Sequence, residues 1–195
     1  MAIRNTTQLG DPLLEAPNST VTNFADPKVK QVIVDLIDSM RHEGLVGMAA
    51  PQIGENYQIF VTEPRETPFR TKDQSDSLRV YINPRIVKKS SAQIIIYEGC
   101  GSVGAANLFG PVLRPKEVTV EAFSEEGKKF QLTGDGLLGR VIQHEMDHLN
   151  NIEFIQKVDD YAKLLTLEWY QKFKKEDAKL KEASKITKKI FQLVK

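Results

Sequence analysis

Residues 137–149 read LLGRVIQHEMDHL, and this stretch decides how the chain is organised. Its apolar members recur with the 3.6-residue period of a helix, and Gly134-Asp135-Gly136 interrupts the strand-like pattern that precedes it. The spacing therefore predicts a buried helix. A helix places residues four apart on one face, so His144 and His148 are expected to lie together, with Glu145 beside them.

Two imidazoles on one helix face can bind a single metal ion, and only three histidines occur in the whole chain. A hydrolytic metal needs three protein ligands and one open position, so a third ligand must come from elsewhere. Cys100 lies between Gly99 and Gly101, and glycines allow close approach of a ligand. We predict a metal site of Cys100, His144 and His148. The alternatives are a solvated histidine pair and a small buried thiol.

The surrounding patterns predict helices and strands in an irregular order. An amphipathic helix is expected from Asp26-Pro27 to about Gly44, and a final helix from Tyr161 to about Ser184. β-branched clusters predict strands at 57–63, 80–86, 94–97, 118–123 and 128–132, the last two as a hairpin. Because these elements form no regular βαβ units, we predict an α+β fold. Antiparallel sheets would surround the central metal-binding helix, with N-terminal and C-terminal helices.

Length and composition favour one compact domain with little overall charge. The 195 residues suit a single core, with a catalytic domain at 1–170 and a basic helical tail of the same domain at 171–195. Lys and Arg number 27 against 26 acids, which excludes a strong overall field toward nucleic acid or an anionic membrane. Cys100 is the single cysteine and the chain has no long apolar run. We expect a cytoplasmic monomer without membrane contact.

Three segments together resemble the peptide deformylases: GMAAPQ at 47–52, EGCGS at 98–102 and QHEMDHL at 143–149. The resemblance implies hydrolysis of the N-formyl group from the formyl-methionine of nascent polypeptides, with release of formate. It implies Fe²⁺ as the cofactor, with Zn²⁺, Ni²⁺ or Co²⁺ able to substitute. By the same resemblance Cys100, His144 and His148 bind the metal and Glu145 transfers protons. Gln52 and the backbone N–H of Gly101 would stabilise the oxyanion.

The resemblance also implies where N-formylmethionyl peptides bind. The substrate-binding positions that it indicates are Val46, Gly47, Ile96, Glu98, Gly99, Leu137 and Val141. The methionine side chain is expected in an apolar pocket, and the peptide backbone is expected to pair with the chain near Val46 and Gly99. Glu98 and Arg114 match a carboxylate and guanidinium pair beneath the site.

Several positions depart from the family pattern without removing a catalytic side chain. The family usually has Gly at Leu45, Leu at Met48, Leu at Gly101, Pro at Gly104 and Gly at Asn151. Gly101 is expected to loosen the segment that presents the oxyanion donor by roughly 0.5–1 kcal/mol of backbone entropy. Leu45 adds bulk just before the segment that pairs with substrate.

Two other functions are compatible with these residues. A zincin-type peptidase would use Glu168 as the third ligand and leave Cys100 without a role. A catalytically weak relative would instead bind ribosomes or nascent chains. The tail supports a ribosomal partner in either case, because residues 171–195 hold nine lysines against three acids. Ribosomal RNA attracts lysines through a salt-sensitive phosphate interaction.

Overall fold

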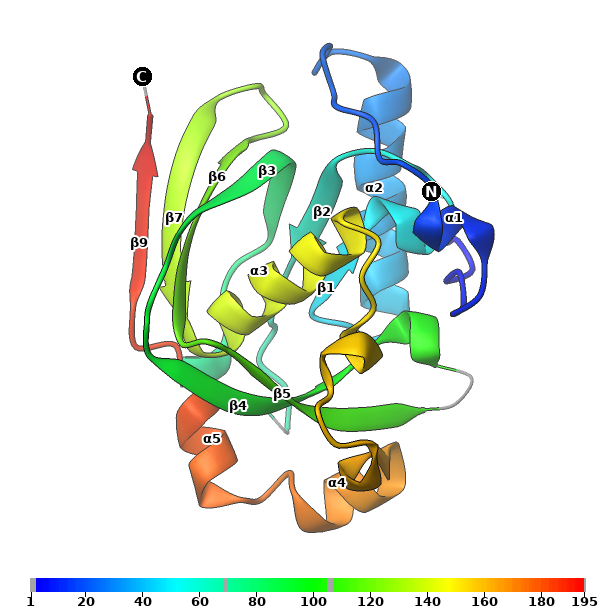
Figure 1. Cartoon of the computed structure of the whole chain (residues 1–195). Helices are drawn as coiled ribbons and strands as arrows, with labels where there is room; N and C mark the ends of the chain where they lie inside the picture. The colour runs from blue at the N-terminus through cyan, green and yellow to red at the C-terminus, as the bar shows by residue number, and fades with distance from the viewer. Residues whose placement is uncertain (1–2, 69, 105–106, 195) are drawn as a thin grey trace.

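The protein is described by a computed structural model that covers residues 3–68, 70–104 and 107–194. Two antiparallel sheets pack around the helix α3 (Gly136–Leu149), as Figure 1 shows. The predicted α+β class is therefore confirmed. The larger sheet has the order β1 (Gly47–Ala49), β2 (Ile59–Thr62), β3 (Arg79–Lys89), β6 (Glu117–Phe123), β7 (Lys129–Asp135) and β9 (Lys189–Leu193). The smaller sheet has the order β4 (Gln93–Gly99), β5 (Leu108–Pro115) and β8 (Leu165–Thr166).

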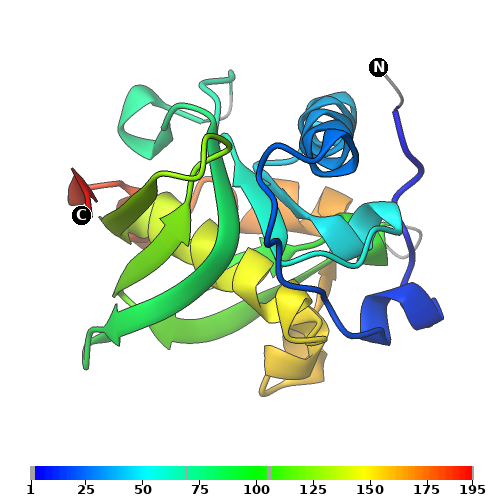
Figure 2. The ribbon, with the colours of Figure 1, turned by 90° about the horizontal axis from the view of Figure 1, so that it is seen from above.

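The helix α3 runs through the middle of the molecule between the two sheets (Figure 2). Its apolar face is fully buried: Leu138 and Ile142 are inaccessible to solvent and pack with the aromatic rings of Phe60 and Tyr81. Burial of such side chains stabilises the fold by about 1.5–3 kcal/mol each. The histidines on the other side of α3 are therefore held on a rigid support.

Two helices precede the sheets. The short α1 (Pro12–Glu15) begins after Asp11, and α2 (Pro27–His42) begins where the sequence predicts. The carboxylate of Asp26 accepts a hydrogen bond from the Lys28 amide at 2.8 Å, and Pro27 occupies the first turn. Both features favour a helix start at this point. None of the described helices is both long enough and apolar enough to cross a membrane.

The C-terminal segment differs from the prediction. In place of one helix to Ser184, the chain forms α4 (Leu167–Phe173) and α5 (Ala178–Ser184), which lie below β4 and β5 in Figure 1. Residues 189–193 form the strand β9, which pairs antiparallel with β7. Asp135 anchors the approach to β9, since its carboxylate accepts hydrogen bonds from the Thr187 and Lys188 amides at 2.8 Å. This part of the tail therefore forms a strand, because pairing with the free edge of β7 outweighs its helical propensity.

Candidate metal centre

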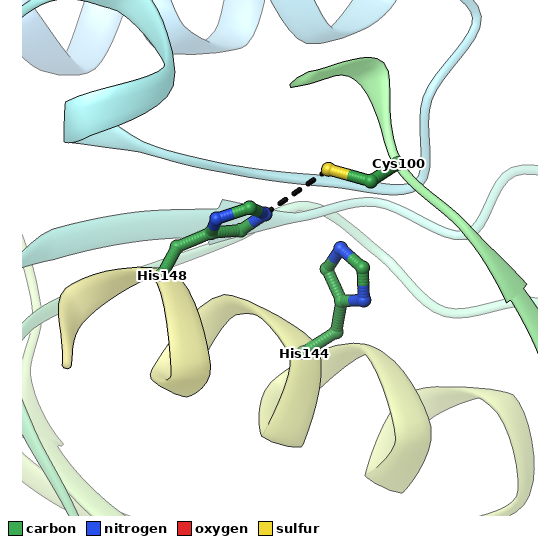
Figure 3. A group of neighbouring side chains, drawn as sticks. All are labelled: Cys100, His144 and His148. Carbon is green, nitrogen blue, oxygen red and sulfur yellow. Dashed lines mark hydrogen bonds between the residues drawn. The ribbon is translucent and has the colours of Figure 1, made fainter. Parts of the chain in front are cut away.

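The structure brings the three predicted ligands together, as Figure 3 shows. Their ligand atoms all lie within 4.8 Å of one another. The Sγ of Cys100 is 3.2 Å from Nε2 of His148, and the two imidazole rings are 5.0 Å apart. Donors around one tetrahedral ion are about 3.5 Å apart at ordinary metal–ligand bond lengths. One thiol and two imidazoles at this spacing therefore fit a single metal ion.

A buried carboxylate fixes the orientation of His144. Oε2 of Glu98 lies 2.9 Å from Nδ1 of His144, which leaves Nε2 for the metal. Arg114 donates to both oxygens of Glu98 at 2.7 and 2.9 Å, so the predicted Glu98–Arg114 pair is present. Burial would raise the pKa of Glu98, but hydrogen bonds from His144 and Arg114 hold it well below its ordinary value. Glu98 therefore stays ionised beneath the site.

Two supporting residues were not anticipated from the sequence. Arg140 donates to Glu98 at 2.7 Å and to the carbonyls of Val112 and Ile94 at 2.9 and 2.8 Å. Glu153 faces the second histidine, with its Oε1 at 3.2 Å from Nδ1 of His148. Both candidate ligand histidines thus have a carboxylate within 3.2 Å of Nδ1, as metal-binding imidazoles usually do. The only signal for Glu153 in the sequence was that an acidic residue follows the histidine helix closely.

The charges at the centre favour a thiolate ligand. Burial would raise the pKa of Cys100, but the positive charge of His148 and hydrogen bonds from both histidines lower it to about 6. Burial lowers the pKa of His144, and its hydrogen bonds with Cys100 and Glu98 outweigh this and raise it to about 10. Without a metal the cluster therefore pairs a thiolate with a protonated imidazole, and a metal ion would take the place of the imidazole proton.

Glu145 lies at the same centre without being one of the three clustered ligands. Its carboxylate packs on Gly47, where an added Cβ would lie 2.5 Å from Oε1. Oε2 is buried and has no hydrogen-bond partner among the described residues. Burial disfavours the charged form and raises the pKa of Glu145 to about 7, against the opposing charges of both histidines. A carboxyl group with this pKa can accept and return a proton near neutral pH.

Gln52 points its amide nitrogen toward the metal ligands. Its Oε1 accepts a hydrogen bond from the Ala49 amide at 2.9 Å, which identifies the oxygen and the nitrogen of the side-chain amide. Nε2 then lies 3.4 Å from Sγ of Cys100 and 3.3 Å from the hydroxyl of Ser102. Gly101 begins the short 3-10 helix Gly101–Val103 directly after the cysteine. A side-chain donor and a backbone segment thus border the metal centre.

One groove of about 1050 Å³ opens at this centre. Its walls include every substrate-binding candidate from the sequence: Val46, Gly47, Ile96, Glu98, Gly99, Leu137 and Val141. The carboxylate of Glu98 is already occupied by Arg114, Arg140 and His144, so its side chain serves the ligand His144. The zincin alternative places Glu168 in the site, but this residue is exposed on α4 and lies outside the cluster.

A sequence profile of the polypeptide deformylase family matches residues 3–163. The chain belongs to this family. It is 38% identical over 161 residues to peptide deformylase 1 of Bacillus subtilis (strain 168), which covers 83% of this chain and 93% of that protein. It is 36% identical over 152 residues to the peptide deformylase of Treponema pallidum (strain Nichols), covering 78% and 86% respectively. The resemblance drawn from the three motifs is confirmed.

Solved deformylase structures have the same fold. A peptide deformylase from Synechococcus elongatus in complex with actinonin superposes with a TM-score of 0.72 at 34% identity, covering 82% of this chain and 81% of that one. The peptide deformylase from Thermotoga maritima gives a TM-score of 0.72 at 29% identity, with coverages of 82% and 100%.

One departure from the deformylase pattern has a local explanation. Asn151 follows α3 with a φ of 60°, the left-handed conformation that favours glycine and tolerates asparagine best among other residues. Its side chain donates to the carbonyls of Leu14 and Ala16 at 2.9 and 3.0 Å. The asparagine therefore keeps the helix end and also ties it to α1.

Proposed function

We propose that this chain removes the formyl group from the N-terminal formyl-methionine of nascent polypeptides and releases formate. The observation that carries the proposal is the position of Glu145 beside the cluster of Cys100, His144 and His148, at one end of the groove. Membership of the polypeptide deformylase family supports the same reaction. We place the reaction in the cytoplasm, where formylated chains are made.

The ligand set suits ferrous iron and accepts zinc, nickel or cobalt, since thiolate and imidazole bind all of these ions. We propose Fe²⁺ as the natural cofactor, held by Cys100, His144 and His148. When bound, such an ion acidifies a water molecule and polarises the formyl oxygen. The lowered pKa of Cys100 supports this assignment, because the thiol must lose its proton to act as a ligand.

The remaining residues handle the proton and the developing charge. Glu145 takes the proton of the attacking water and passes it to the leaving amine, in keeping with its pKa of about 7. Nε2 of Gln52 and the backbone N–H of Gly101 donate to the oxyanion, and each such donor contributes roughly 10²–10³ in rate. Glu98 holds His144 in one tautomer throughout.

The groove supplies the peptide-binding surface. We propose that the methionine side chain lies among Val46, Ile96, Leu137 and Val141, which are apolar and line the groove near the metal ligands. The edge of β4 next to Gly99 offers backbone groups for an extended peptide. The side-chain pocket then selects methionine, and the backbone pairing accepts varied residues after it.

A ribosomal partner remains a proposal that rests on the basic tail. Lys172 and Lys179 are exposed on α4 and α5, and RNA phosphates attract such side chains in a salt-sensitive way. Deleting 172–195 would remove β9 from the sheet, so the charge reversals Lys172→Glu and Lys179→Glu are the better test. Co-sedimentation with ribosomes should weaken in the double variant and with added salt. Equal pelleting of both proteins would contradict the proposal.

Formate release from a formyl-Met-Ala-Ser peptide tests the main proposal, with iron-loaded protein prepared without oxygen. We expect turnover with the intact chain and a loss of at least about 10² with Glu145→Gln, while both proteins keep stoichiometric metal. Absence of formate from the fully metallated intact chain would favour a binding protein without turnover. Cleavage of an internal peptide bond would favour a peptidase.

A further inference from the structure

The groove extends past the metal centre to a wall that lies beyond the family match. The matched region ends at residue 163, whereas Leu167, Tyr170, Gln171, Leu180 and Ser184 from α4 and α5 line the far part of the groove. Both helices lie against the smaller sheet below β4 and β5 (Figure 1). The groove is therefore lined in part by residues that the family match does not include.

Contacts at several points fix this wall. The ring of Tyr170 stacks on Phe109 at 4.6 Å with an angle of 7° between the planes, and it also contacts the ring of Tyr97 at 5.7 Å. After α5, the amide of Ile186 donates to the carbonyl of Asp73 at 2.7 Å. The wall is thus attached to β4, to β5 and to the loop that precedes β3, and it can act as a preformed binding surface.

The lining of the groove also includes the guanidinium of Arg70, which has no carboxylate partner among the described residues. Arg70 donates to the carbonyl of Arg65 at 2.8 Å, and no carboxylate of the described residues lies within 4.0 Å of its nitrogens. Arg65 lies 3.3 Å from Glu63, a carboxylate that also binds Arg41 at 2.8 Å. Burial and the charge of Arg65 both lower the pKa of Arg70, against a smaller opposing effect of Tyr170.

Two lysines of the wall, Lys181 and Lys185, differ from Arg70 in this respect. Lys181 lies 2.5 Å from Glu176, and Lys185 lies 2.7 Å from Glu182. In each pair the lysine and the glutamate neutralise each other within the C-terminal segment. Arg70 has a half-buried position and several N–H donors, so an anionic group entering the groove could form a charge-assisted hydrogen bond with it.

We propose that Arg70, which lines the same groove as α4 and α5, binds a carboxylate side chain in the peptide downstream of formyl-methionine. The enzyme would then prefer nascent chains with Asp or Glu within the second to fourth residue. An extended peptide advances about 3.4 Å per residue, so a single position should carry the preference. This inference rests on the proposed deformylase activity.

The test compares C-terminally amidated formyl-Met peptides that carry Asp or Asn at position two, three or four in otherwise identical sequences. Amidation leaves the side chain as the only carboxylate, and peptides with a free C-terminus show whether a terminal carboxylate gives the same gain. At one position we expect kcat/KM for the Asp peptide to exceed that for the Asn peptide by about 3- to 10-fold. The difference should come from KM and should be smaller at high salt.

Variants link the preference to its residue. In Arg70→Gln the Asp to Asn ratio should fall to about 1 while the Asn peptide keeps its kcat/KM, and Arg70→Lys should retain part of the ratio. Lys179→Gln, an exposed residue outside the groove, is the matched control and should keep the full ratio. Formate release with a ratio near 1 at all three positions would refute the inference alone. Absence of formate from every peptide would refute the proposed function.

Discussion

Leu45 occupies the space that a side chain on residue 101 would take. A Cβ added to Gly101 would lie 2.9 Å from Cδ1 of Leu45 and 3.4 Å from Cγ2 of Thr6. The resemblance implies glycine at the first position and leucine at the second in relatives, so we expect the two departures to compensate each other. Leu45, in the segment before β1, would then supply the packing next to the proposed oxyanion donor.

The two substitutions should therefore couple. Gly101→Leu alone overpacks the contact with Leu45 and should cost about 1–3 kcal/mol. Leu45→Gly alone removes a half-buried leucine and adds a flexible glycine, which together cost about 2 kcal/mol. In the double variant the new leucine fills the vacated space and the clash is gone. Its destabilisation should be smaller than the sum of the single effects by about 1–3 kcal/mol.

Urea unfolding of the four proteins measures this coupling, and kcat/KM for a formyl-Met peptide measures its effect on the site. Gly101→Leu alone should lower kcat/KM by about tenfold because it displaces the segment that carries the donor N–H. The double variant should recover most of that loss. Stability effects that add within about 0.5 kcal/mol would refute the compensation, as would higher activity in Gly101→Leu alone.

Three further predictions concern the metal centre and the tail. Cys100→Ala and His148→Ala should each lose tight metal binding, since two remaining ligands do not hold a hydrolytic ion, and stoichiometric metal in the Cys100→Ala protein would overturn its assignment. Glu145→Ala should keep the metal, measured by elemental analysis, and lose activity by about 10² or more; loss of the metal would make it a ligand. Burial raises the pKa of Asp76, but hydrogen bonds from Arg79 and Lys189 outweigh this and lower it, so the carboxylate stabilises the fold above its unfolded pKa of about 3.9. This contribution is lost as the pH falls through the lower folded pKa, so the gap between the urea midpoints of the intact chain and Asp76→Asn should stay constant from pH 7 to about pH 5 and narrow at lower pH; a gap that does not narrow would contradict the assignment.

Local signals in the sequence were sufficient for the helices α2 and α3 and for five strands. The strand β5 was missed because Gly110, Pro111 and Pro115 interrupt its pattern. In the structure β8 pairs only with Leu108 and Phe109 of β5. Pro111 and Pro115 therefore lie on a part of β5 whose outer edge has no pairing strand among the described residues. Proline is tolerated there because no second partner needs its missing N–H. That circumstance depends on the position of β8 and is not visible in the sequence.

In the candidate site, too, some features follow from local sequence patterns and others depend on the fold. The ligands come from two compact motifs, so spacing on a helix and flanking glycines were enough to nominate them. Arg140 was not nominated, because its role appears only when α3 lies across β4 and β5 and brings it to Glu98. The chemistry of the reaction came from the resemblance of three motifs. Periodicity alone predicted no more than a buried helix carrying two histidines.

The tail illustrates why a local charge count overstates an interaction surface. Its nine lysines suggested a basic helix free in solvent, yet several are engaged within the fold. Lys188 lies 2.7 Å from Glu117 and Lys189 lies 2.6 Å from Asp76, while Lys181 and Lys185 pair with acids of the tail itself. The contacts of Lys188 and Lys189 help to attach the strand β9 to the rest of the protein. The charge left to attract RNA is therefore smaller than the sequence suggests, and the same segment that would meet the ribosome also forms the wall of the groove.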